Sequence, residues 1–173
     1  MNADQIAKLK KISQQLRKSV IRELSEAGSG HSAGCLGFAD VMAVLYFHVM
    51  RLDPENPNWE YRDIFVMSNG HYAPLLYATL AERGFFDKKE LANLRKFGSK
   101  LQGHPERGSL PGIETTSGPL GCGLSQAAGM AYSLQYLGGN SERFVYCSLG
   151  DGELDEGNIW EAAMFAKKYN LAN

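Results

Sequence analysis

The chain has 173 residues, a length that supports one domain with a hydrophobic core but leaves little room for two. Its 18 Lys and Arg residues nearly balance its 19 Asp and Glu residues, so the net charge is close to zero. This balance gives no electrostatic reason to expect a nucleic acid or a membrane surface as a partner. We therefore expect residues 1–173 to form one domain that binds neither.

The three cysteines bear on the cellular compartment. Cys35, Cys122 and Cys147 are far apart and form no C-x-x-C pair, so neither a zinc site nor a disulfide framework is indicated. Their small or apolar neighbours are typical of buried, reduced thiols. No apolar segment reaches membrane-spanning length, and the first residues resemble an amphipathic helix more than a signal peptide. These features predict a cytoplasmic protein.

The first part of the chain is predicted to be helical. Apolar residues recur at spacings of three and four up to a glycine cluster at 28–30, which predicts one face of a long helix. These residues are Ile6, Leu9, Ile12, Leu16, Val20 and Leu24. The segment 38–49 is apolar nearly all round and is expected to form a helix buried on several sides. His48 within it is expected to be a core or edge histidine with a satisfied hydrogen bond.

Short apolar strands then alternate with helices. Residues 64–67 (Ile-Phe-Val-Met) are predicted to be a buried strand, followed by a turn and a helix that ends near Leu80. Asp87, with Glu90 three residues later, predicts a capping box for another short helix. The periodicity is lost between residues 98 and 118, and a loop of that length in a compact domain is usually functional.

The last third of the chain continues this alternation. The helix predicted after Gly123 is rich in small residues, which favour close packing against another backbone. The apolar run 144–149 predicts a short buried strand, and a final helix is expected from about Glu156 to Lys168. Together the elements predict an α/β fold with an open, mostly parallel sheet flanked by helices.

The most informative segment is Gly150-Asp151-Gly152, directly after the second predicted strand. The glycines allow the backbone to approach an anionic ligand, and the Asp151 carboxylate offers hard oxygen atoms to a divalent cation. In open parallel sheets, phosphate-bearing ligands bind at the carboxyl ends of the strands. An ordinary turn could carry the same three residues.

Three of the four histidines, His31, His71 and His104, lie beside glycines. Histidine is suited to donating hydrogen bonds to phosphate and to transferring protons near neutral pH. A metal ion held by histidines alone is the competing interpretation, but their spacing matches no helical or turn-based metal motif. The sequence contains no G-x-S-x-G elbow, Walker motif or dinucleotide fingerprint.

Five ordered motifs resemble the transketolase family. They are Ser29-Gly-His-Ser-Ala-Gly, Ser68-Asn-Gly-His-Tyr-Ala-Pro, Gly103-His-Pro-Glu, Thr116-Ser-Gly-Pro-Leu-Gly-Cys-Gly and Gly150-Asp-Gly-Glu-Leu-Asp-Glu-Gly. The match runs from about residue 15 to the end of the chain. The last motif is most similar to the amino-terminal subunits of split transketolases, whose diphosphate-binding and pyrimidine-binding domains are separate chains.

This resemblance implies the thiamine diphosphate-binding fold and a role for each matching residue. Asp151 would bind the Mg²⁺ or Ca²⁺ ion that bridges the diphosphate of thiamine diphosphate. The amide of Gly152 and the side chain of His71 would contact that diphosphate. Main-chain groups of three residues would line the rings of the cofactor: Gly118, Pro119 and Leu120.

The resemblance also implies the catalytic residues and the reaction. His31 and His104 would contact the hydroxyl groups of the donor ketose, and Glu156 would join a proton network at a subunit interface. An acid at that position is equally explained by the dipole of the following helix. The implied reaction is reversible transfer of a two-carbon ketol group from a ketose phosphate to an aldose phosphate, with the cofactor as electron sink.

The resemblance further implies a partner. The family keeps the glutamate that activates the cofactor on a pyrimidine-binding domain, so we expect a C-terminal transketolase subunit as partner, in a homodimer or heterotetramer. The family completes the metal site with an Asn-Asn pair after a further strand, and this chain ends at Asn173, where that strand should begin. We therefore expect a domain that is incomplete at its C-terminus and an isolated chain that is inactive.

Two alternatives remain at this point. One is another thiamine diphosphate enzyme, such as a deoxyxylulose-phosphate synthase or a dehydrogenase component. The amino-acid sequence of the motif at 68–74 argues against the synthase. The other is a truncated, non-catalytic domain.

Overall fold

The computed structural model describes residues 1–137 and 142–173. In chain order its regular elements are α1 (Ala3–Ala27), α2 (Ala33–Val44), the π-helix η1 (Leu45–Val49), β1 (Ile64–Met67), the 3₁₀-helix η2 (Gly70–Tyr72), α3 (Ala73–Arg83), the 3₁₀-helix η3 (Lys88–Asn93), α4 (Cys122–Tyr136), β2 (Val145–Ser148), the 3₁₀-helix η4 (Gly152–Asp155) and α5 (Gly157–Lys168).

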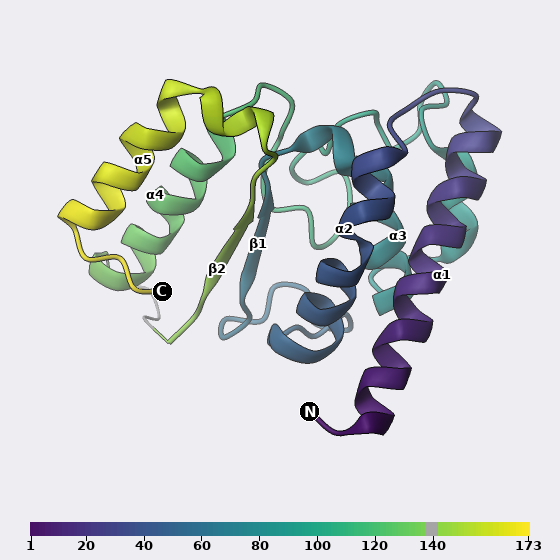
Figure 1. Cartoon of the computed structure of the whole chain (residues 1–173), viewed down its shortest axis with the longest axis horizontal. Helices are drawn as coiled ribbons and strands as arrows, with labels where there is room; N and C mark the ends of the chain where they lie inside the picture. The colour runs from purple at the N-terminus through teal and green to yellow at the C-terminus, as the bar shows by residue number, and fades with distance from the viewer. Residues whose placement is uncertain (138–141) are drawn as a thin grey trace.

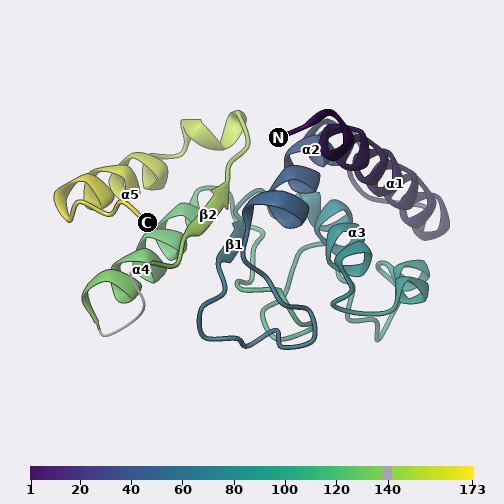
Figure 2. The ribbon, with the colours of Figure 1, turned by 90° about the horizontal axis from the view of Figure 1, so that it is seen from below.

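These elements form three layers. β1 and β2 pair in parallel and form the middle layer; α1, α2 and α3 cover one face, and α4 and α5 cover the other (Figures 1 and 2). The predicted α/β fold with a parallel sheet flanked by helices is confirmed. In the described part of the chain no helix is long and apolar enough to cross a bilayer.

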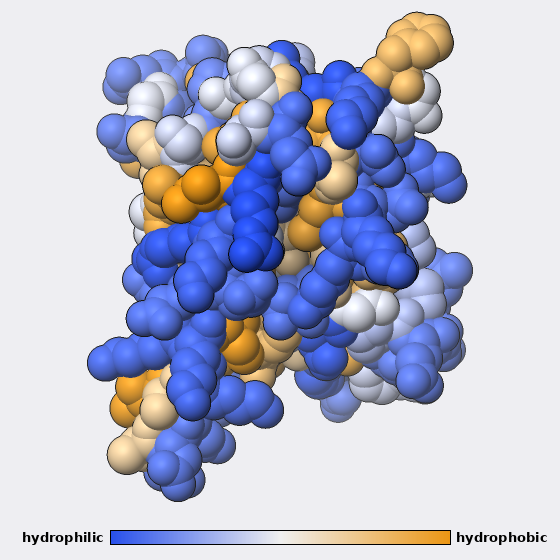
Figure 3. Space-filling model, turned by 90° about the vertical axis from the view of Figure 1, so that its right-hand side faces the viewer, coloured by the Kyte–Doolittle hydropathy of each residue, from blue (hydrophilic) through white to orange (hydrophobic). Residues whose placement is uncertain are grey.

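Helix α1 follows the predicted pattern over most of its length. It ends at Gly28, whose left-handed backbone (φ 65°) lets its N–H donate to the carbonyl of Leu24. Leu16 and Val20 are fully buried, whereas Ile6 is 40% exposed because the first turns of α1 extend beyond the neighbouring helices (Figure 1). Hydrophilic side chains cover most of the outer face that α1 presents (Figure 3).

The helix expected at 38–49 differs in its start and its end. It begins earlier, at Ala33, and its last turn is the π-helix η1. Val41 and Val49 are exposed, so the segment is less buried than its composition predicts. His48 lies at the exposed edge, and its ring has no hydrogen-bond partner among the described residues, so the expected satisfied hydrogen bond is absent there.

The short helix expected after Asp87 is a 3₁₀-helix without a complete capping box. The Asp87 side chain accepts a hydrogen bond from the amide of Lys89 at 2.9 Å, but the Glu90 carboxylate turns forward and accepts from Asn93 at 3.2 Å. Because the reciprocal bond of a capping box is missing, only the start of this helix was correctly predicted.

The two strands divide the core between the helical layers. Phe65 and Met67 of β1 pack into the cluster formed with α1, α2 and α3, whereas Ile64 and Val66 pack against α4. This alternation follows from the two-residue period of a strand.

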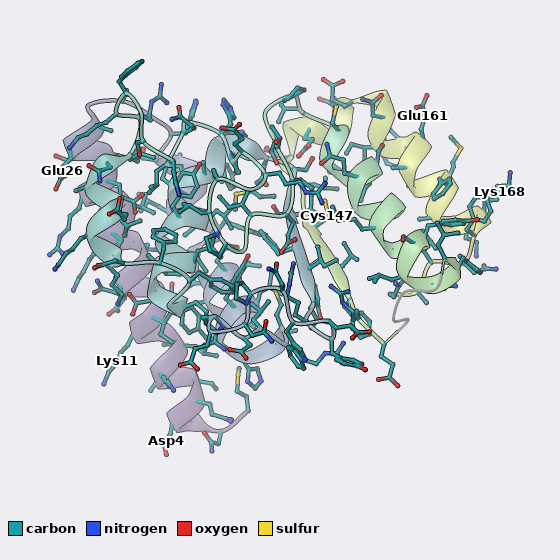
Figure 4. The ribbon with its side chains drawn as sticks, turned by 180° about the vertical axis from the view of Figure 1, so that it is seen from behind. Asp4, Lys11, Glu26, Cys147, Glu161 and Lys168 are labelled. Carbon is teal, nitrogen blue, oxygen red and sulfur yellow. The ribbon has the colours of Figure 1, made fainter. Side chains whose placement is uncertain are left out.

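Strand β2 is less buried than predicted, since only Ser148 among its four residues is buried. Among the described residues, its second edge is paired only at its start, where the N–H of Val145 donates to the carbonyl of Asn173 at 2.8 Å. All three cysteines are free; Cys35 is buried as expected, but Cys122 and Cys147 are half-buried. Cys147 lies at the sheet, between the helical layers (Figure 4), and burial raises the pKa of its thiol to about 12.

Candidate functional site

The predicted site residues lie in loops that meet at one end of the sheet. His71 follows β1, and Asp151 and Gly152 follow β2, so the parallel pairing brings them to the same edge. The starts of α2, α4 and α5 lie at that end of the molecule as well (Figure 1). This is the position at which open α/β sheets bind their ligands.

Three histidines from three segments come together there. The ring centroids of His31 and His71 are 5.3 Å apart, edge to face. His104 lies beside the loop that precedes α4, since a Cβ atom placed on Gly118 would be 3.8 Å from the Cγ of His104. Burial is the main cause that lowers the pKa of His71, and electrostatic repulsion from His31 and His104 lowers it further. Glu153 acts in the opposite direction and raises the pKa. His71 is therefore neutral at neutral pH, with one N–H to donate.

The loop expected to line the cofactor packs tightly against the turn after β1. A Cβ atom on Gly70 would be 2.8 Å from the Cβ of Ser117 and 2.9 Å from the amide nitrogen of Gly118, so only glycine allows this contact. The hydroxyl of Tyr77 donates to the carbonyl of Gln102 at 3.0 Å and fixes the earlier part of the same loop. The start of the segment Gly118-Pro119-Leu120 is thereby held against Gly70, the residue before His71.

Asp151 is exposed, and its carboxylate has no hydrogen-bond partner among the described residues. It precedes η4, at whose first position Gly152 exposes its backbone. No group of three or more His, Cys, Asp or Glu side chains suited to a metal ion occurs in the described ranges, 1–137 and 142–173. A single carboxylate nevertheless fits Mg²⁺ bound to a diphosphate, because Mg²⁺ commonly takes one or two carboxylates together with phosphate oxygens.

Glu156 lies at the start of α5. It is exposed and immediately precedes α5, and a Cβ atom on Gly121 would be 2.9 Å from its Cβ. The structure thus brings Glu156 against the loop before α4, on the side of the site that faces α5.

Glu153 was not singled out by the sequence reasoning. Its side chain is buried, with 1% exposure, and one carboxylate oxygen accepts from the amide of Gly121 at 2.8 Å and from the hydroxyl of Ser68. The other oxygen accepts from the amide of Gly150 at 3.0 Å. The one sequence signal for Glu153 was its position directly after Gly-Asp-Gly. Because an acid at a helix start is ordinarily solvated, this position did not predict that the Glu153 side chain is buried.

The fold and these contacts define an α/β protein with a candidate anion and cation site at the carboxyl ends of a parallel sheet. Comparison with known sequences identifies the family. The family model described as "Transketolase, thiamine diphosphate binding domain" matches residues 8–173, so the chain belongs to this family.

Individual relatives agree with this assignment. Human transketolase is 48% identical over 165 residues, which cover 95% of this chain and 26% of that protein. The "6-deoxy-6-sulfo-D-fructose transketolase subunit SqwG" of Clostridium sp. (strain MSTE9) is 44% identical over 151 residues, covering 87% of this chain and 54% of that subunit. This chain therefore spans about a quarter of the first of these relatives and about half of the second.

Solved structures show the same fold. Transketolase from Leishmania mexicana matches with a TM-score of 0.87 and 36% identity, over 91% of this chain and 25% of that one. Transketolase from Campylobacter jejuni matches with a TM-score of 0.86 and 37% identity, over 99% of this chain and 27% of that one.

Proposed function

We propose that this chain is the diphosphate-binding part of a thiamine diphosphate-dependent transketolase. The reaction is reversible transfer of a two-carbon ketol group from a ketose phosphate to an aldose phosphate. The observation that carries the proposal is the convergence of Asp151, His71 and the Gly118–Leu120 segment at the carboxyl ends of β1 and β2. Family membership and the names of the relatives support the same conclusion.

The cofactor would be held mainly by the two loops that follow the strands. Asp151 would bind Mg²⁺ or Ca²⁺ through its exposed carboxylate, and the amide of Gly152 would donate to the diphosphate. His71 is suited to the same role, because its lowered pKa leaves it neutral and able to donate one N–H. Main-chain groups of Gly118, Pro119 and Leu120 would contact the rings of the cofactor. The cofactor supplies the electron sink for carbon–carbon bond cleavage.

The sugar would lie over the exposed histidines. His31 and His104 are both solvent-accessible at the mouth of the site, and they would bind hydroxyl groups of the sugar and transfer protons. Glu156 would act from the side of α5, in a proton network that continues into a partner subunit.

A partner carrying the pyrimidine-binding domain completes the proposal. The outer surface of α5 exposes Trp160 (60%) and Met164 (66%). Phe165 (37% exposed) lies against Tyr132 of α4, at a groove of about 300 Å³ between the two helices. Exposed apolar side chains grouped in this way are typical of protein–protein contacts. We propose a C-terminal transketolase subunit or domain at this face, in a dimer or heterotetramer. The free cysteines support a cytoplasmic location.

The decisive experiment combines the chain, in the length present in its source, with the subunit that co-purifies with it. Thiamine diphosphate binding is measured by calorimetry with and without Mg²⁺, and ketol transfer is measured on a panel of ketose and aldose phosphates that includes sulfonated ketoses. We expect turnover only when chain, partner, cofactor and cation are all present. Turnover by residues 1–173 alone would contradict the requirement for a partner.

Two other outcomes would replace the proposal. Cofactor binding without ketol transfer on any sugar pair would indicate a different thiamine diphosphate enzyme, such as deoxyxylulose-phosphate synthase or a dehydrogenase component. Absence of cofactor binding in the complete assembly would indicate a non-catalytic domain.

A further inference from the structure

We infer that Glu153 is a positioning residue that fixes the three loops of the candidate site relative to one another. The inference extends the proposed function, on which its consequence for cofactor binding rests. Glu153 follows the Gly-Asp-Gly turn by one residue, yet its side chain points inward and is 1% exposed. It is therefore not one of the solvated acids that surround it in sequence.

The contacts of Glu153 join segments that are distant along the chain. Oε1 accepts from the hydroxyl of Ser68, at the end of β1, and from the amide of Gly121, before α4. Oε2 accepts from the amide of Gly150, at the end of β2. The Ser68 hydroxyl in turn accepts from the amide of Gly123 at 3.0 Å, so the first turn of α4 joins the same network.

Each of these segments carries a proposed ligand of the cofactor or the cation. Ser68 begins the turn that contains His71, and Gly150 directly precedes Asp151. Gly121 ends the loop whose three preceding residues would line the cofactor rings, and its left-handed backbone (φ 85°) suits glycine. One carboxylate thus sets the spacing between the proposed cation ligand and the proposed diphosphate ligands.

Energetics favour a positioning role over simple stabilisation. A buried carboxylate loses its hydration, and apolar side chains of the same volume often stabilise a core as well or better. A fully satisfied polar network, in contrast, fixes one geometry of the groups that it joins. All the donors to Glu153 come from segments of the site, so the geometry that it fixes is that of the site.

Asp63 provides a matched control at the opposite end of the same strands. It is also 1% exposed, and it accepts from the amide of Phe144 at 2.9 Å and from the guanidinium and amide of Arg51 at 2.9 Å. It therefore joins β1 to β2 as Glu153 does, but at their amino ends, away from the site.

The test compares Glu153→Gln, Glu153→Met and Asp63→Asn in the complete assembly of chain and partner. The first readout is the amide proton shift and the hydrogen-exchange rate of Gly121 and Gly150 without cofactor. The second is the Kd for thiamine diphosphate with Mg²⁺, referred to the folded fraction from unfolding curves. We expect Glu153→Met to speed exchange at both amides and to weaken cofactor binding by about 10- to 100-fold, the usual effect of removing a group that orients ligands.

Glu153→Gln should fall between the wild type and Glu153→Met, because one acceptor oxygen remains, and it keeps the test valid if Glu153→Met does not fold. Asp63→Asn should lower stability and leave the Kd of the folded fraction within about twofold of wild type. Unchanged Gly121 and Gly150 amides in both Glu153 variants would overturn the inference, as would an equal loss of affinity in Asp63→Asn. If the amides respond but wild-type protein does not bind thiamine diphosphate, the inference stands and the proposed function fails.

Discussion

The imidazole rings of His31 and His71 lie 5.3 Å apart, edge to face, although His31 precedes α2 and His71 follows β1. Burial lowers the pKa of His71, and the positive charges that His31 and His104 would carry lower it further. A ring that resists protonation keeps a neutral N–H donor in the site throughout the neutral pH range.

Replacing one neighbour should therefore change the titration of His71. In His31→Gln the pKa of His71 should rise toward its ordinary value of 6.5, because one repulsive charge is removed and burial remains. The measurement is an NMR titration of the His71 ring protons, with the exposed His48→Gln as control. A wild-type pKa at or above 6.5 would show that the ring is not in the environment described.

The same shift predicts a pH dependence of stability. Since the pKa of His71 is lower in the folded state, the unfolded chain binds the proton more readily. The contribution of His71 to stability should be complete above pH 6.5 and be lost as the pH falls through its folded value. Denaturant unfolding curves from pH 7.5 downward would measure this loss, which should be smaller in His71→Gln than in wild type.

Asp151→Asn should abolish cation-dependent cofactor binding with little effect on the fold. The Asp151 carboxylate is exposed and has no hydrogen-bond partner among the described residues, so its removal breaks no contact there. We expect an affinity loss for thiamine diphosphate with Mg²⁺ of at least about 100-fold, since even groups that only orient ligands contribute about 10- to 100-fold. Calorimetry measures it, and Asp155→Asn, another exposed acid of the same turn, should bind as wild type does. Equal affinity of Asp151→Asn and Asp155→Asn for thiamine diphosphate with Mg²⁺ would show that Asp151 does not bind the cation.

Glu23 should destabilise the folded chain in a pH-dependent way. It is 2% exposed, neither carboxylate oxygen has a hydrogen-bond partner in the part of the chain described, and burial raises its pKa to about 9. Because the folded pKa is raised, the contribution of Glu23 to stability is complete below the unfolded value of 4.5 and is lost as the pH rises through about 9. Glu23→Met, of similar volume, should raise the free energy of unfolding at pH 7 by about 1–3 kcal/mol.

The control for this prediction is Glu26→Met, one turn later on the exposed surface of α1 (Figure 4). It should change the stability by less than about 0.5 kcal/mol, as surface substitutions usually do. Equal unfolding midpoints for Glu23→Met and wild type from pH 6 to pH 9 would contradict the unpartnered, neutral carboxyl group.

Two glycines of α4 should respond in opposite ways to alanine. A Cβ atom on Gly123 would be 2.3 Å from the Cβ of Ser68, so Gly123→Ala should cost about 1–3 kcal/mol through overpacking. Apart from its chain neighbours and the nearby backbone of α4 itself, no heavy atom of the described chain lies within 4 Å of a Cβ atom on Gly129, so Gly129→Ala should stabilise the helix by about 0.5–1 kcal/mol. Thermal unfolding of the pair tests both signs, and a destabilised Gly129→Ala would contradict the open position.

The outer surface of α5 should control association with the proposed partner. Met164 is 66% exposed, so Met164→Asp should not affect the fold but should weaken the complex by about tenfold or more if this face is covered. Lys11→Asp, on α1 at the other side of the sheet (Figure 4), provides a matched surface control. Sedimentation of chain and partner measures the effect. Equal affinity of Met164→Asp and Lys11→Asp for the partner would show that the outer surface of α5 is not the interface. Glu161 and Lys168, also at the surface of α5 (Figure 4), extend the region to be tested.

Much of the fold followed from local rules. The glycine after α1, the apolar run of β1 and the loss of periodicity after residue 98 are local signals, and the structure confirms each of them. The convergence of His71 and Asp151 was also predictable, because residues that follow neighbouring parallel strands must share one edge of the sheet.

Burial and side-chain direction depended on contacts between distant segments. The sequence predicted a buried strand at 144–149, yet β2 is half-buried because little of its second edge is paired. The helix expected at 38–49 ends in the π-helix η1. Ile6 is exposed because the first turns of α1 extend beyond the neighbouring helices. Local periodicity carries no information on where neighbouring elements end.

Glu153 shows the difference most directly. Its position after Gly-Asp-Gly placed it among acids that are ordinarily solvated at a helix start. Only the packing of β1, β2 and the loop before α4 brings the Ser68 hydroxyl and the amides of Gly121 and Gly150 around one carboxylate. The sequence by itself determined which residue types the candidate site contains and at which end of the sheet they lie. Tertiary structure decided which acid faces solvent and which faces the backbone, because that depends on donors from segments far apart along the chain.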